Sequence, residues 1–185
     1  HHAVVTVARN GVSDSIPCFA EWEEATWDAI ARTGYARLVL RGNNGTTWTR
    51  ELFFLNAQGL VIHDHVAAES DGDYTIQSNL RTPGNVAAWE RRYGIKETVV
   101  NITRMRVHAR LKAGEGVSFV HYAHARQADE PDPIMTVDGV GTISLHGLRE
   151  PVELLTHRPI ELKPESCLTT DSREPFSLNA TTVAE

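Results

Sequence analysis

The segment from Trp48 to Val66 constrains the fold of this chain more than any other stretch of its sequence. β-Branched and aromatic residues are dense on both sides of a short break, Asn-Ala-Gln-Gly, at residues 56–59. This pattern is typical of two antiparallel strands joined by a tight turn. Because side chains alternate between the two faces of a strand, Asp64 shares one face with aliphatic neighbours, whereas His63 and His65 point to the opposite face.

A carboxylate among aliphatic side chains has to be paired or neutralised, since burying an unpaired charge is costly. Arg50 lies on the preceding strand of the predicted hairpin and can form a bidentate ion pair with Asp64. The alternative is that Asp64 is a functional carboxylate at the edge of a cleft. We expect the structural ion pair, because a buried carboxylate needs a partner of this kind.

The rest of the chain repeats the pattern of short strand, turn and short strand. Further strands are expected at residues 3–7, 35–40, 73–80, 99–111, 116–125, 134–137, 140–145 and 152–155. Residues 19–33 have apolar side chains at helical spacing but are also compatible with two twisted strands, which we favour. About ten strands with little helix between them indicate an all-β fold, an antiparallel β-sandwich. This domain is expected to cover residues 1–163, and the Ser-, Thr-, Glu- and Pro-rich residues 164–185 to form a loosely ordered tail.

Composition excludes two classes of partner. The chain has 185 residues and a formal charge of −6, which argues against a nucleic-acid surface because such a surface needs a basic face. No apolar run approaches the roughly 20 residues that a membrane-spanning helix requires. The two cysteines, Cys18 and Cys167, could form a disulfide in an exported protein or could be two buried thiols, and the sequence leaves both open.

Two histidines at positions i and i+2 raise the question of a metal. His63 and His65 project from the same face of the predicted strand, a spacing that can chelate zinc, and His121 on a later strand could supply a third ligand. The chain has nine histidines, so chance pairs are common. We therefore expect solvated or hydrogen-bonded histidines and no cofactor, with zinc as the alternative.

Two groups of cationic residues are candidates for contact with an anionic ligand. One predicted loop combines flat apolar rings with guanidinium groups in Trp89, Arg91, Arg92 and Tyr93. The even-numbered face of the run 99–111 carries a basic row, formed by Arg104, Arg106, His108 and Arg110. Ring stacking together with guanidinium–carboxylate pairing suits an acidic sugar. The alternative is a loop anchor and a solvated strand face.

One family resemblance rests on the order of these strands. The arrangement aromatic-x-Arg, apolar strand, turn, Gly-Leu-Val-Ile-x-Asp-x-Val and a second alternating strand resembles the C-terminal β-sandwich of the heparinase II/III-like polysaccharide lyases. The matching pieces are residues 48–54, 59–66 and 73–76, and the likeness is clearest over residues 35–80. The resemblance implies a β-sandwich, a carbohydrate context and a secreted or periplasmic location.

The same resemblance limits what is expected of catalysis. Such lyases cleave acidic polysaccharides by β-elimination, with a tyrosine and a histidine or asparagine as acid and base groups. Most of that machinery belongs to a helical toroid that precedes the sandwich, and this sequence shows no such helical region. The resemblance therefore transfers no catalytic residue to this chain.

The sequence thus predicts a β-sandwich module of a larger polysaccharide-lyase-like protein, non-catalytic alone. Its expected partners are an acidic polysaccharide or a preceding helical domain. Whether the chain is itself an enzyme stays open. One alternative is a small metal-dependent enzyme that uses His63 and His65, and another is a purely structural docking module.

Overall fold

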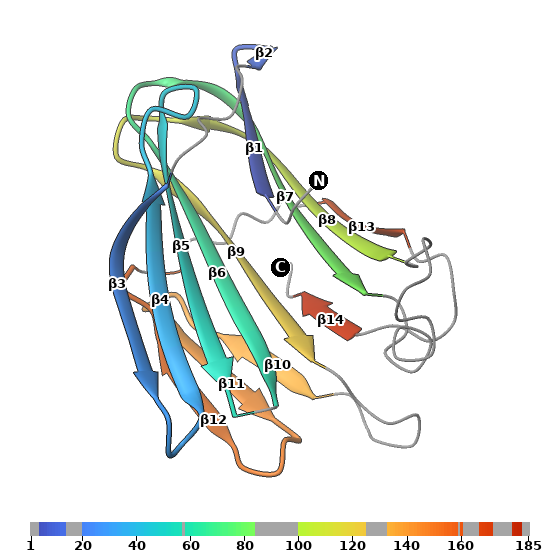
Figure 1. The fold of residues 1–185 in the computed structure, drawn as a ribbon. Helices are drawn as coiled ribbons and strands as arrows, with labels where there is room; N and C mark the ends of the chain where they lie inside the picture. The colour runs from blue at the N-terminus through green and yellow to red at the C-terminus, as the bar shows by residue number, and fades with distance from the viewer. Residues whose placement is uncertain are drawn as a thin grey trace, which may run out of the picture.

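A computed structural model describes residues 4–13, 20–56, 58–83, 100–124, 133–158, 160, 167–171 and 179–182, with the backbone alone at residues 81–83, 100–104, 167–171 and 179–182. These residues form fourteen β-strands and no helix. The strands make three antiparallel sheets (Figure 1). The expected all-β fold is confirmed. Within the part of the chain that is described, no helix could cross a membrane.

The largest sheet, here called the central sheet, has six strands in the order β14-β9-β6-β5-β4-β3. Its strands are β3 (Glu21–Asp28), β4 (Thr33–Leu40), β5 (Thr46–Leu55), β6 (Gly59–Ala68), β9 (Gly116–His124) and β14 (Asn179–Thr182). The predicted hairpin of residues 48–66 is the β5–β6 pair, and its register places Arg50 opposite Asp64. The β4–β5 turn has positive φ angles at Gly42, Asn44 and Gly45, which Gly and Asn adopt more readily than other residues.

Two smaller sheets pack on the central sheet. The five-stranded sheet has the order β13-β8-β7-β1-β2. Its strands are β1 (Val4–Arg9), β2 (Val12–Ser13), β7 (Gly72–Pro83), β8 (Val100–Leu111) and β13 (Cys167–Asp171). The three-stranded sheet consists of β10 (Ile134–Val137), β11 (Thr142–His146) and β12 (Val152–Leu155), in that order.

The two smaller sheets cover opposite faces of the central sheet, and each encloses its own core. One core joins the five-stranded sheet to a central-sheet face that includes Val66 and Phe119. The other joins the three-stranded sheet to the opposite face, which includes Val61 and Tyr122. Because these residues alternate along β6 and β9, both faces of these strands are covered. Residues 61–66 are accordingly all buried, whichever face they point to.

Two regions differ from a simple sandwich pattern. The ambiguous residues 19–33 contribute strand β3, which pairs with β4 and has a β-bulge between Trp22 and Glu24. In the region 164–185, expected to be a loose tail, β13 pairs with β8 and β14 pairs with β9. Sheet edges present unpaired N–H and C=O groups, and a short polar segment can satisfy them despite its low hydrophobicity. Cys18 lies outside the described residues, so the structure tests neither the disulfide nor the alternative of two buried thiols.

Candidate functional site

The predicted ion pair forms between β5 and β6 of the central sheet. Arg50 Nε and Nη2 donate to Asp64 Oδ1 and Oδ2 at 2.7 and 2.8 Å, so the pair is bidentate. Trp48 Nε1 also donates to Oδ1 at 2.7 Å, and its ring lies 4.8 Å from the guanidinium carbon. Burial alone would raise the pKa of the fully buried Asp64, but the charge and hydrogen bonds of Arg50 outweigh this effect and lower it.

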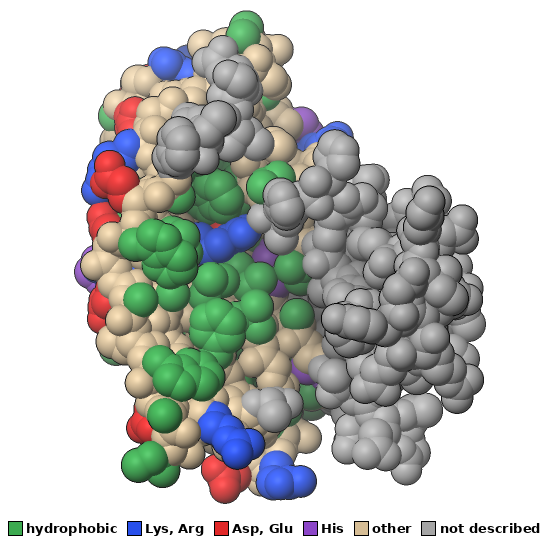
Figure 2. All heavy atoms as spheres, in the orientation of Figure 1, with side chains coloured by type: hydrophobic (Ala, Val, Ile, Leu, Met, Phe, Trp, Pro, Cys, Tyr) green, Lys and Arg blue, Asp and Glu red, His purple; other side chains and the backbone are tan. Residues whose placement is uncertain are grey.

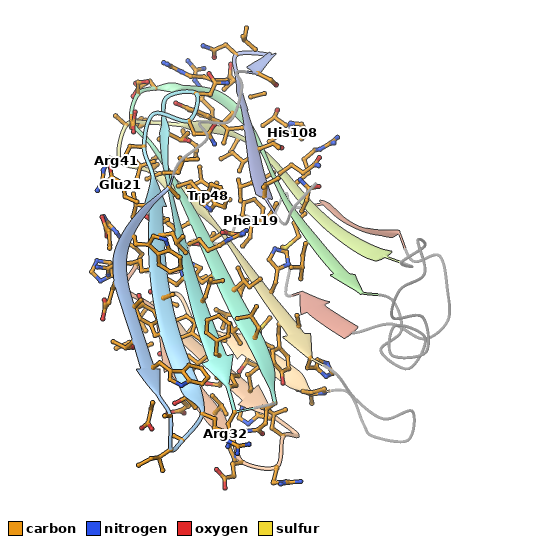
Figure 3. All side chains as sticks on the ribbon, viewed as in Figure 1. Glu21, Arg32, Arg41, Trp48, His108 and Phe119 are labelled. Atoms are coloured by element: carbon orange, nitrogen blue, oxygen red, sulfur yellow. The ribbon has the colours of Figure 1, made fainter. Side chains whose placement is uncertain are left out.

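A serine and a histidine complete this interior cluster. Ser78 Oγ lies 3.4 Å from Asp64 Oδ2 and 2.9 Å from His121 Nε2. Burial disfavours the cationic imidazole and lowers the pKa of His121 to about 4, although the charge of Asp64 acts in the opposite direction. Trp48 and Phe119 point into the space between the central and five-stranded sheets (Figure 3). Asp64, Ser78 and His121 are buried in this cluster, whereas 16% of the Arg50 side chain is exposed.

A second polar network occupies the opposite face of the same strands. Glu51 Oε2 lies 2.9 Å from His63 Nδ1, and His63 Nε2 lies 3.2 Å from Ser118 Oγ. The same hydroxyl lies 3.2 Å from His65 Nδ1. Tyr35 donates its hydroxyl to Glu51 Oε1 at 2.7 Å. The carboxylate, hydroxyl and imidazoles thus form a continuous chain of hydrogen bonds.

The order of groups in this chain matches that of a serine nucleophile with a histidine base and an acid. Hydrogen bonds from His63 and Tyr35 lower the pKa of Glu51 against the opposing effect of burial, so Glu51 accepts the proton of His63 Nδ1. His63 Nε2 then accepts from Ser118. Glu51, His63 and Ser118 are, however, each at most 3% exposed. A polymeric substrate cannot reach them, and the network is a buried structural one.

The sequence analysis missed Glu51 and Ser118. Glu51 could have been found, because the hairpin register that sets Arg50 opposite Asp64 also sets Glu51 opposite His63. Ser118 could not, since its position opposite His65 depends on pairing between β6 and β9, which are distant in sequence.

The three-histidine metal site does not form. His121 pairs with Ile62 and therefore lies on the opposite face of the central sheet from His63 and His65. His63 and His65 both bond to Ser118 instead. Among the described residues, no group of three or more His, Cys, Asp or Glu side chains could hold a metal ion. The i, i+2 spacing alone did not reveal on which face the third histidine falls.

The basic row on β8 is solvent-exposed. Arg106, His108 and Arg110 are exposed on the outer surface of the five-stranded sheet, and His108 points away from the sandwich (Figure 3). Arg106 lines a groove of about 380 Å³ together with Thr6, Ser13, Thr75 and Gln77. Arg104 lies on the same strand, but its side chain is outside the described set, as are Trp89, Arg91, Arg92 and Tyr93.

A third feature lies on the central sheet, beside its edge strand. Figure 2 shows hydrophobic side chains gathered over a face of the molecule that strands β3 to β6 form. The large exposed hydrophobic residues of these strands are aromatic: Trp22, Trp27 and Phe54. Trp27 and Phe54 also line a pocket of about 720 Å³ near the β3–β4 and β5–β6 turns. This pocket was not anticipated from the sequence.

Comparisons of the chain with models of protein families, with curated proteins and with solved structures found no match.

Proposed function

We propose that this chain is a non-catalytic β-sandwich module that contacts an acidic polysaccharide, as the sandwich domain of a heparinase II/III-like polysaccharide lyase would. The observation that carries the proposal is the groove on the five-stranded sheet, where Arg106 lies among hydroxyl and amide side chains. No carboxylate is among the described residues that line this groove. An acidic sugar would therefore find a cation and neutral hydrogen-bonding groups there, without a repelling charge.

The state of Arg106 supports this proposal. Its Nε and Nη2 groups donate to Gln77 Oε1 at 2.9 and 2.5 Å, which fixes the plane of the guanidinium. A guanidinium has five N–H groups, so three remain for a carboxylate or sulfate, as far as the described residues show. A pre-oriented guanidinium binds such anions with less loss of side-chain entropy than a free one. His108 and Arg110 extend the row along the same strand.

The burial of the acid–base groups supports a non-catalytic role. Four acid–base residues are at most 1% exposed: Asp64, Glu51, His63 and His121. Each of them is hydrogen-bonded within one of the two networks described above. β-Elimination needs a base and an acid within reach of the sugar ring. In a lyase of the resembled type, a preceding helical domain would supply these groups and would be the expected partner of this module.

The test is binding of acidic oligosaccharides to the full chain and to the Arg106→Ala variant. We expect heparin or alginate oligosaccharides to bind the parent chain, and the variant to bind about tenfold more weakly. Binding should weaken as salt is added, because an exposed charge pair is screened. The matched control is Arg149→Ala, which removes an exposed arginine from the loop before β12. Equal binding by parent and Arg106→Ala would rule out this groove as the binding surface.

A further inference from the structure

Strand β3 forms one edge of the central sheet, and this edge is open. Among the described strands it pairs with β4 alone, and Figure 1 shows it as the outermost strand on that side of the sheet. All eight of its residues are exposed. Alternate residues of an edge strand direct their backbone N–H and C=O groups away from the neighbouring strand. Within the described part of the chain, β3 therefore presents backbone groups that could pair with a further strand.

One face of β3 is apolar and continues the aromatic face of the sheet. The register places Trp22, Ala25 and Trp27 on the same face as Phe54 of β5. The rings of Trp27 and Phe54 meet edge to face, with centroids 6.5 Å apart. Trp22 and Trp27 are nevertheless 66% and 62% exposed. Covering these rings with another apolar surface would remove a large apolar area from water, which is favourable.

The opposite face of β3 is acidic. Glu24 is directly opposite Arg37, whereas Trp22 is opposite the adjacent Leu38, so Glu24 and Trp22 point to opposite faces. The charged residues of β3 are all acidic: Glu21, Glu23, Glu24 and Asp28. Arg37 and Arg41 form ion pairs with the first three of these. Two arginines do not neutralise four carboxylates, so this edge keeps a negative charge.

The structure of β3 restricts which strand could pair with it. Natural edge strands are protected from unwanted pairing by bulges, by charges or by short length. The bulge of β3 lies between Trp22 and Glu24, and residues 24–28 keep a regular register with β4. The acidic side chains repel a second copy of this chain, since its β3 is equally acidic and its net charge is −6. The same side chains attract a basic strand.

From these observations we propose that the free edge of β3 pairs with an extended strand of a partner protein, in which apolar residues alternate with Lys or Arg. This strand becomes the seventh of the six-stranded central sheet. Its apolar side chains lie beside Ala25 and Trp27, and its basic side chains lie beside Glu24 and Asp28. Backbone hydrogen bonds supply affinity, and the alternating side chains supply selectivity. The interaction does not depend on the groove at Arg106.

The first test identifies the preferred sequence of the added strand. A display library of peptides as long as β3, with Val, Tyr, Thr, Lys or Glu at each position, is selected on the immobilised full chain. We expect the selected peptides to carry Val or Tyr at every second position and Lys at the positions between. The proposal is overturned if no peptide is enriched, if the alternation is missing, or if Glu is as frequent as Lys.

The second test asks whether the bound peptide joins the sheet. Only alternate N–H groups of an added strand face β3, so N-methylation of one alternate set should abolish binding. N-methylation of the other set should leave binding nearly unchanged. Fluorescence anisotropy with the tightest selected peptide measures both. Equal binding by the two methylated peptides would mean that the peptide adheres to the aromatic face without backbone pairing, which contradicts the proposal.

Variants of the protein locate the peptide on β3. Trp27→Ala should weaken binding about fivefold. Its matched control is Leu155→Ala, because Leu155 is 74% exposed but lies on β12 of the three-stranded sheet. Glu24→Lys should weaken binding of the Lys-containing peptide and strengthen binding of the same peptide with Glu in place of Lys. The control for this charge reversal is Glu153→Lys, at an exposed position of β12. If either control has the same effect as its β3 counterpart, the peptide does not bind at β3.

Discussion

The Arg50–Asp64 and Glu51–His63 pairs are neighbours on β5 and β6, yet they face opposite sides of the central sheet. Each buries a carboxylate almost completely. Asp64 receives most of its compensation from Arg50, a partner that stays charged at any ordinary pH. Glu51 is stabilised by several donors, the His63 ring, the Tyr35 hydroxyl and the backbone N–H of His157.

The two sides differ in how many donors stabilise the buried carboxylate. On the Asp64 side the stabilisation of a full negative charge comes mainly from a single guanidinium, with smaller contributions from Trp48 and His121. On the Glu51 side it is divided among three donors, so the loss of any one leaves the others in place. Substitutions on the Asp64 side should therefore have larger effects, and the following experiments examine that expectation from the largest effect to the smallest.

The largest effect is expected for Arg50→Met, which keeps much of the side-chain volume but leaves Asp64 buried without its cation. Breaking a buried ion pair by removing one partner costs about 3–5 kcal/mol. The free energy of unfolding, measured by urea denaturation, should fall by that amount. The double variant Arg50→Met/Asp64→Leu should recover most of the loss, because apolar groups of similar size replace both charges. A loss below about 1 kcal/mol in the single variant would contradict the importance assigned to this pair.

The charged pair was predictable from sequence because everything that defines it is local. The turn at residues 56–59 sets the register, the register sets Arg50 opposite Asp64, and alternation assigns the face. The same reasoning would have given Glu51 and His63. By contrast, the positions of Ser118 and His121 depend on the β6–β9 pairing, and no turn between these strands determines its register. For this reason the sequence could not show that His121 lies on the opposite face from His63 and His65.

Two larger features of the fold could not be predicted from local sequence patterns. Period-two patterning indicates that a strand has a buried face, but both faces of β6 are buried because two different sheets cover them. The region 164–185 has too little apolar character to predict strands, and its pairing is dictated by the open edges of β8 and β9. The pocket beside β3 has a similar origin, since its walls come from three separate turns and strands.

The next prediction concerns His121, on the Asp64 side, and the pH dependence of the free energy of unfolding. Its folded-state pKa is about 4, against 6.5 for the ordinary group, so the unfolded chain binds more protons between these values. Stability is therefore complete above pH 6.5 and falls as the pH drops towards 4. The loss due to this group is on the order of 3 kcal/mol.

Comparing variants isolates this contribution. His121→Gln should flatten the stability profile between pH 6.5 and 4.5, above the range in which the lowered pKa values of Asp64 and Glu51 matter. His108→Gln is the control, because His108 is exposed and lies on the outer surface. Equal slopes for the parent and His121→Gln would mean that folding does not lower the pKa of His121.

The smallest effect concerns the two serines that complete the two networks, one on each face. Ser118→Ala removes the hydroxyl between the rings of His63 and His65 and should lower the free energy of unfolding by about 1–2 kcal/mol. Ser78→Ala should cost less, about 1 kcal/mol, because Arg50 and Trp48 continue to bond to Asp64. Urea denaturation at pH 7 compares them directly. The reverse order would show that the Asp64 side also depends on its neutral donors, and the contrast between a concentrated and a distributed network would not hold.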